Sequence, residues 1–176
     1  RNIGVRSSHI SMSFSYTYFL GEVDPKLDLD FNYVLPVSKE KVVKVEKLFN
    51  VDDRYFNEDK PKNWTAFLIK NSKQDTVKAM RKGVVVRIEN KHNISTSSSR
   101  SFTTDTNTIL IEHKDGSFSR YGAFEKDKIF VKLGQTVYPH TKLGLTTEYN
   151  QGEYRLYFSI FYKTEGTDDQ GKKKYV

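Results

Sequence analysis

The sequence has no cysteine and only four histidines among its 176 residues. The absence of cysteine excludes disulfide bridges and cysteine-based zinc sites. The histidines, at positions 9, 92, 113 and 140, lie too far apart to form a metal-binding pair on one helix or strand. The signatures His-Glu-x-x-His, His-x-His and Gly-x-Ser-x-Gly are missing, as is a glycine-rich phosphate loop. No apolar run approaches the length of a membrane span, so none is expected.

The charge is strongly basic, with a formal net charge of +7 and an isoelectric point of about 9.4. A basic surface attracts polyanions such as nucleic acid, anionic lipid or acidic envelope polymers. Here the basic residues are scattered, and the only dense run is 172–174, beside the C-terminus. Such tails are usually solvated. We therefore expect no nucleic-acid partner and interpret most of the lysines as a solvated surface.

The aromatic content, with 11 Tyr and 12 Phe, favours β structure because these rings suit half-buried pleated surfaces. Residues 38–49 fit a helix or a strand equally well by periodicity. The Ser/Thr/Asn-rich stretch 89–108 predicts a long exposed loop, and Asp115-Gly116 predicts a tight hairpin turn with positive φ. Strands are predicted at 14–20, 31–35, 64–69, 84–88, 109–113, 118–121 and 154–162.

These elements predict a mostly-β chain that forms a single antiparallel β-sheet or β-sandwich, with N-terminal extension strands. The expected division is an N-terminal arm and strand extension at 1–32, a β domain at 33–165, and a basic C-terminal tail at 166–176. The chain begins with Arg1, so we expect it to be processed or truncated.

Two single residues invite a functional interpretation. His113 ends a predicted strand beside the Asp-Gly turn, where it is a ligand or base candidate, but a hydrogen-bonded strand-end histidine is the favoured interpretation. Trp64 is a candidate stacking platform for a sugar or base, although core packing is commoner for a lone tryptophan in an apolar run. An atypical hydrolase site around His113, Asp115 and His140 remains an alternative at this stage.

The order of the elements resembles the lysostaphin-type (LytM-like) zinc metallopeptidases, which cut peptide cross-links in bacterial peptidoglycan. Residues 108–116 resemble the family's strand and Asp-Gly hairpin, and 131–137 resemble its Gly-Gln-x-Val turn. The resemblance runs from about Tyr33 to Tyr162 and also includes residues 33–36, 75–79, 83–85, 119–121 and 143–144. It implies the β-sheet core of that family.

The resemblance also implies where the zinc ligands belong, and this sequence departs from the family at each of those positions. Trp64 and Leu68 stand where the family has its zinc-binding His and Asp, and Tyr157 stands where it has the second zinc-binding His. Ala123 and Arg155 stand where it has two assisting histidines. Leu and Ala carry no lone pair, indole nitrogen only donates, and a guanidinium repels a metal ion.

The resemblance therefore implies a catalytically inactive pseudopeptidase of the bacterial envelope, without metal or cofactor. Its expected location is periplasmic or secreted, and its expected partner is peptidoglycan or a cell-wall hydrolase that it regulates. Alternatives are an active peptidoglycan hydrolase with an atypical site and a basic β-rich nucleic-acid-binding module. A ligand groove is expected from the aromatic and cationic side chains of Trp64, Tyr121, Arg155, Tyr157 and His113.

Overall fold

The regular structure is almost entirely β. The computed structural model describes residues 12–14, 16, 20–48, 65–93, 106–167 and 173–175. Within these ranges there is no α-helix, and a 3-10 turn, η1 (Lys39–Lys41), precedes the first strand. The strands are β1 (Val42–Leu48), β2 (Thr65–Asn71), β3 (Thr76–Lys78), β4 (Gly83–Glu89), β5 (Asn107–Glu112), β6 (Phe118–Ile129), β7 (Thr136–Val137), β8 (Lys142–Asn150), β9 (Glu153–Phe161), β10 (Glu165–Thr167) and β11 (Lys173–Tyr175).

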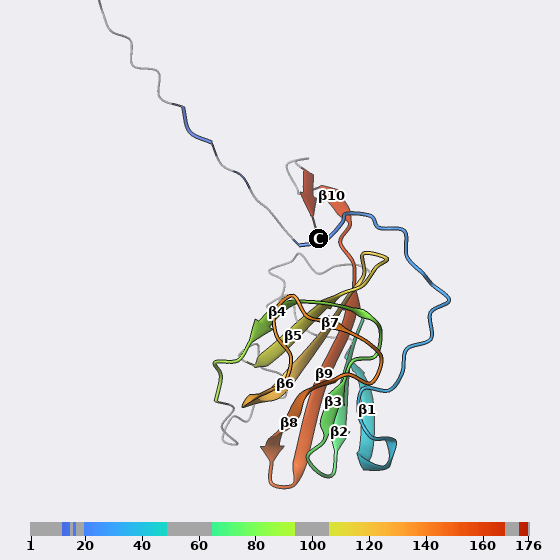
Figure 1. Ribbon diagram of the computed structural model, residues 1–176, viewed down its shortest axis with the longest axis vertical. Coiled ribbons are helices and arrows are strands. Elements are labelled where there is room, and N and C mark those ends of the chain that lie inside the picture. The colour runs from blue at the N-terminus through green and yellow to red at the C-terminus, as the bar shows by residue number, and fades with distance from the viewer. Residues whose placement is uncertain are drawn as a thin grey trace, which may run out of the picture.

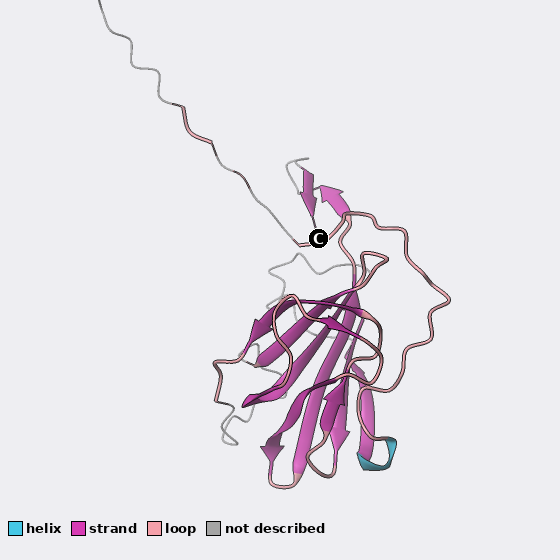
Figure 2. Cartoon of the chain, viewed as in Figure 1, coloured by secondary structure: helices cyan, strands magenta, loops and turns pink. Residues whose placement is uncertain are grey.

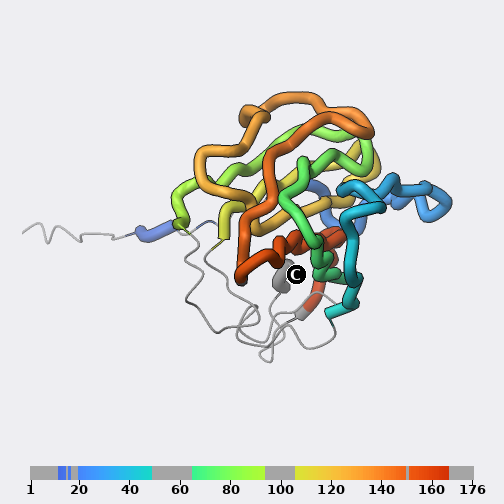
Figure 3. Tube along the Cα trace, turned by 90° about the horizontal axis from the view of Figure 1, so that it is seen from below, coloured from blue at the N-terminus to red at the C-terminus, as the bar shows by residue number. Residues whose placement is uncertain are grey.

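Nine of these strands form one antiparallel sheet in the order β1-β2-β9-β8-β6-β5-β4-β7, with β3 added beside β8. The predicted mostly-β, single-sheet fold is confirmed. The long strand β6 pairs with β9 through its first half and with β8 through its second half. Figures 1 and 2 show these strands side by side, with the short β10–β11 pair apart from them. Seen from below, the sheet is a curved layer (Figure 3).

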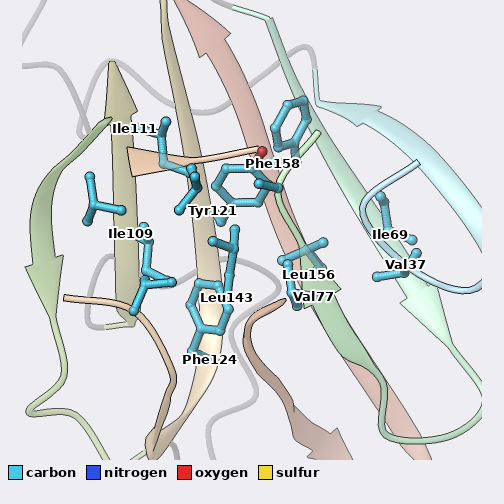
Figure 4. Close-up of a cluster of buried hydrophobic side chains, with 14 residues drawn as sticks. Val37, Ile69, Val77, Ile109, Ile111, Tyr121, Phe124, Leu143, Leu156 and Phe158 are labelled. Atoms are coloured by element: carbon cyan, nitrogen blue, oxygen red, sulfur yellow. The ribbon is translucent and has the colours of Figure 1, made fainter. Parts of the chain in front are cut away.

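The register of three neighbouring strands separates the two faces of the sheet. Ile69 of β2 pairs with Leu156 of β9, and Phe158 of β9 pairs with Tyr121 of β6. Because side chains alternate along a strand, these residues share one face. They join the hydrophobic core, in which Val77 is also fully buried (Figure 4).

Most of the predicted strands are confirmed, and the ambiguous segment 38–49 contains β1. The hairpin turn is also confirmed, since Gly116 has a φ of 77°. The predicted loop 89–108 is too long at both ends, because Glu89 belongs to β4, and Asn107 and Thr108 are buried in β5. Residues 94–105 of that loop lie outside the described residues.

The predicted extension strand at 31–35 is wrong, because this segment is not a strand of the sheet. Its backbone makes isolated bonds instead, with the Val34 N–H donating to the Met80 carbonyl at 3.3 Å. For the predicted strand at 14–20, residues 15 and 17–19 lie outside the described residues, and Phe14 and Tyr16 are exposed. The aromatic side chains of Phe31 and Tyr33 contact Arg81 instead.

Arg81 bonds both this N-terminal segment and the β5–β6 hairpin turn. Its Nη1 donates to the Asp115 carboxylate at 2.8 Å and to the Tyr33 hydroxyl at 3.3 Å. Its guanidinium also lies 4.2 Å from the centre of the Phe31 ring, a cation–π distance. Arg81 is only 7% exposed. One buried cation therefore connects two chain segments that the sheet does not pair.

Replacing Arg81 by methionine is expected to lower the free energy of unfolding by about 3 kcal/mol, because it leaves the half-buried Asp115 carboxylate without its cation. The control is Asp28→Asn, which removes the longer 3.7 Å ion pair of Arg81 with an exposed carboxylate and is expected to cost less than about 1 kcal/mol. Urea denaturation measures both variants. Equal losses for the two would contradict the role given to the Asp115 pair.

Candidate functional site

Backbone pairing brings together four of the positions that the sequence analysis singled out. Leu68 of β2 pairs with Tyr157 of β9, and Tyr157 pairs with Gly122, the neighbour of Ala123 in β6. Arg155 precedes Tyr157 by two residues and so lies on the same face of β9. This face, opposite the hydrophobic core, is called the site face below. Trp64, the fifth position, lies outside the described residues.

Ala123 marks the point where β6 passes from one neighbour to the other. The residues before it pair with β9, and Phe124 after it pairs with Thr146 of β8. Ala123 is buried and has a φ of 70°, in the left-handed region that non-glycine residues rarely adopt. This conformation costs roughly 1–2 kcal/mol for an L-residue. The bend in β6 is therefore held by the two strand pairings on either side of it.

Arg155 is the main charged group on the site face. Its guanidinium carbon lies 3.3 Å from the centre of the Tyr149 ring, and its Nε bonds the Glu153 carboxylate. Burial works against the charge, but the hydrogen bonds to Glu153 and Tyr157 outweigh it and raise the pKa of Arg155. Burial in turn raises the pKa of the Tyr157 phenol, with Arg155 acting in the opposite direction. The site face thus combines a permanent cation with a neutral phenol.

These residues do not fit the zinc ion that the resemblance implies. The donor set would be the leucine Leu68, the alanine Ala123, the fixed cation Arg155 and the protonated phenol of Tyr157, which together offer no ready ligand. Elsewhere in the described ranges, no three His, Asp or Glu side chains converge into a metal-binding group. No step of a metal-assisted hydrolysis can be built from these side chains.

Two residues of the predicted ligand groove lie elsewhere. Tyr121 is fully buried on the core face, and its hydroxyl accepts the Met80 N–H at 3.0 Å. Burial raises its pKa to about 12. His113 is 3% exposed and extends the core-facing series of Ile109 and Ile111 along the chain. The prediction that Tyr121 and His113 line the groove is therefore wrong. Of its other predicted members, Arg155 and Tyr157 lie on the site face, and Trp64 lies outside the described residues.

His113 has both ring nitrogens occupied. Nδ1 lies 2.8 Å from the Lys82 carbonyl, and Nε2 lies 3.0 Å from the Ser119 hydroxyl. A carbonyl only accepts, so Nδ1 carries the proton and Nε2 accepts from Ser119. Burial is the largest influence on His113 and lowers its pKa. This is the hydrogen-bonded histidine that the sequence favoured, and its nitrogens are turned to the protein and not to solvent.

The sequence analysis missed Lys70 and Arg120 on the site face. Lys70 pairs with Arg155, and Arg120 pairs with Ser159, two residues beyond Tyr157. Both follow from period-two alternation once Leu68 and Tyr157 are placed on neighbouring strands. Burial lowers the pKa of Arg120. The site face therefore carries three cations along β2, β9 and β6, two of which pair with the carboxylates of Glu46 and Glu153.

A separate cavity of about 280 Å³ lies where β2 begins and β9 ends. It is lined by the N-terminal segment, including Phe31 and Tyr33, together with Asp115 and Tyr162. None of the described residues at the replaced positions lines it. The cavity and the site face are thus distinct features of the molecule.

The family model of peptidase family M23 matches residues 62–169, more than half of the chain. The chain belongs to this family. The matched range contains β2 to β9, and therefore all the strands that build the site face. No curated protein matches the chain.

Three solved structures are similar to the chain at low identity. A zinc containing peptidase from Vibrio cholerae is 22% identical, with a TM-score of 0.46, over 72% of this chain and 35% of that chain. A chain of the SpoIIQ–SpoIIIAH pore forming complex is 17% identical, with a TM-score of 0.49, over 82% of this chain and 87% of that chain. A putative peptidase M23 from Pseudomonas aeruginosa is 18% identical, with a TM-score of 0.47, over 79% of this chain and 50% of that chain. This M23 chain thus spans about a third of the Vibrio peptidase and half of the Pseudomonas one.

The buried His113 predicts a loss of stability in mild acid. Its pKa is lowered in the folded state, so the unfolded chain binds a proton first as the pH falls below about 6.5. The free energy of unfolding should therefore fall from pH 7.5 to 5.5, by at most about 1.4 kcal/mol per pH unit for this one group. Urea denaturation across this range measures the slope. The His113→Gln variant should show a flatter slope, and an unchanged slope would assign the effect to another group.

Proposed function

We propose that this chain is a non-hydrolytic member of family M23 that binds acidic peptide chains of the bacterial envelope on its site face. One observation carries the proposal. Leu68 pairs with Tyr157, and Tyr157 pairs with Gly122, the neighbour of Ala123. The resemblance implies zinc ligands at Leu68 and Tyr157 and an assisting residue at Ala123. A leucine, an alanine and a phenol in those places support loss of the metal.

The groups that remain on the site face suit a carboxylate ligand. Arg155 can only donate, so its hydrogen bond with Tyr157 makes the phenol oxygen the acceptor and directs the Tyr157 proton away from the guanidinium. Lys70, on the neighbouring strand, adds a partly exposed cation that lies 3.5 Å from the Glu46 carboxylate. Each cation already pairs with one carboxylate, Arg155 with Glu153 and Lys70 with Glu46. The phenol donor beside them supplies a hydrogen bond for a further carboxylate. Peptidoglycan peptide stems carry such carboxylates, as do acidic segments of proteins.

The proposed setting is the periplasm or the cell exterior, and the proposed partner is peptidoglycan or a wall hydrolase that the chain regulates. The described residues contain no helix long and apolar enough to cross a membrane. The alternative hydrolase site receives less support, because His113 is buried and hydrogen-bonded on both nitrogens and Asp115 is bound to Arg81. Nucleic-acid binding receives no specific support from the scattered cations.

The loss of metal is tested by loading the purified chain with zinc, dialysing it, and measuring metal by mass spectrometry. We expect no stoichiometric zinc and no release of fragments from peptidoglycan, because the replaced positions supply no ligand set. An M23 peptidase with its histidines intact serves as the positive control. One zinc per chain, or turnover that a chelator stops, would overturn the proposal.

Ligand binding is tested with the Tyr157→Phe variant, which removes one hydroxyl and keeps the ring. We expect its affinity for soluble muropeptides with free stem carboxylates to fall about tenfold, the effect of one charge-assisted hydrogen bond. Isothermal titration calorimetry measures both proteins. The matched control is Tyr138→Phe at an exposed tyrosine after β7, which should bind as the unmodified chain does. No binding by the unmodified chain, or equal affinities for the two variants, would contradict ligand binding on the site face.

A further inference from the structure

Strand β1 ends the sheet on one side. Within the part of the chain that the structure describes, β1 has a strand neighbour only on its β2 side, and Figure 1 shows it at the margin of the sheet. It is seven residues long, whereas β7 at the opposite end of the strand order has only two. An edge strand presents a row of backbone N–H and C=O groups that another strand can pair with. The longer edge, β1, can therefore form more backbone hydrogen bonds with an added strand than β7 can.

The side chains of β1 are unusual for an exposed strand. Val43 is 69% exposed and Val45 is 53% exposed, although both are apolar. Val45 pairs with the buried Ile69, so it lies at the open rim of the core face. On the opposite face, Lys44 and Glu46 flank Val45 and form an ion pair at 2.6 Å. Two exposed valines beside a matched pair of opposite charges favour an apolar, charge-complementary partner strand.

The order of charges along β1, Lys44 before Glu46, is complementary to the same strand running in the opposite direction. If two copies pair antiparallel about a two-fold axis at Val45, Lys44 of each copy faces Glu46 of the other, and the two Val45 side chains face each other. The irregularity between Val42 and Lys44 limits the matched region to residues 44–46. No other antiparallel register centred within the strand matches both charges in this way. The complementarity favours a second copy over an unrelated strand.

We propose that β1 pairs with β1 of a second copy of this chain, forming a symmetric dimer with one continuous sheet. The inference does not depend on the proposed ligand of the site face. A contact limited to one strand pair buries less area than a permanent dimer needs, so the dimer is weak and depends on protein concentration. Self-pairing also covers Val45, which the single chain leaves 53% exposed.

The test uses charge-swapped variants of the whole chain in sedimentation velocity across a wide concentration range. The unmodified chain should show a reversible monomer–dimer equilibrium. Lys44→Glu alone, or Glu46→Lys alone, should weaken association at least about tenfold, because each places like charges opposite one another twice. The double swap, K44E with E46K, should restore association. The matched control is Lys128→Glu, an equal change of charge at an exposed residue of β6, which should leave it unaltered.

Mixing the two single variants gives the decisive result. Position 44 of the Lys44→Glu chain then faces position 46 of the Glu46→Lys chain, which sets a carboxylate opposite an ammonium group. The native Glu46 of the first chain likewise faces the native Lys44 of the second. The mixture should therefore form heterodimers, whereas neither variant pairs well with itself.

Thermal unfolding at low concentration checks that each single variant still folds. A chain that stays monomeric at every concentration, or single variants that associate like the unmodified chain, would overturn the proposal. Failure of muropeptide binding with dimerisation intact would count against the proposed function alone.

Discussion

The antiparallel pairing of β9 between β2 and β6 is the constraint on which the rest of the structure depends. A slip of β9 by one residue would turn its core side chains to the opposite face of the sheet. In the observed register, Ile69, Leu156 and Tyr121 pack in the core, and Leu68 and Tyr157 lie opposite. The backbone hydrogen bonds of this pairing therefore fix the core and the site face together.

The strands were largely predictable because their residue types and turns agree with the final fold. Asp115-Gly116 turns as expected, and β4 and β9 follow their apolar runs. The segment at 31–35 has the same aromatic and β-branched composition but is no strand, because its rings pack around Arg81. Local composition does not record that distant contact. Tertiary packing overrides strand propensity there.

The candidate site was only partly predictable. The positions 68, 123, 155 and 157 came from the family resemblance, and the sheet places them in neighbouring strands. Tyr121 and His113 were assigned to the groove by residue type, which says nothing about the face on which a side chain lies. Tyr121 pairs across the sheet with the buried Phe158, and His113 follows the buried Ile111 by two residues, so both side chains lie on the core face. Lys70 and Arg120 were missed for the same reason.

The Arg81 cluster also has a consequence for local opening of the native state. Residues 27–33 are held by side-chain contacts to one guanidinium and by a hydrogen bond from the Asp28 N–H to the Asp115 carboxylate, not by a ladder of sheet hydrogen bonds. Segments of this kind open at a free energy well below that of global unfolding. Amide protons there should exchange with solvent long before those of β5, β6 and β9. Each such opening would uncover Phe31 and Tyr33 and the walls of the adjoining cavity while the sheet stays intact.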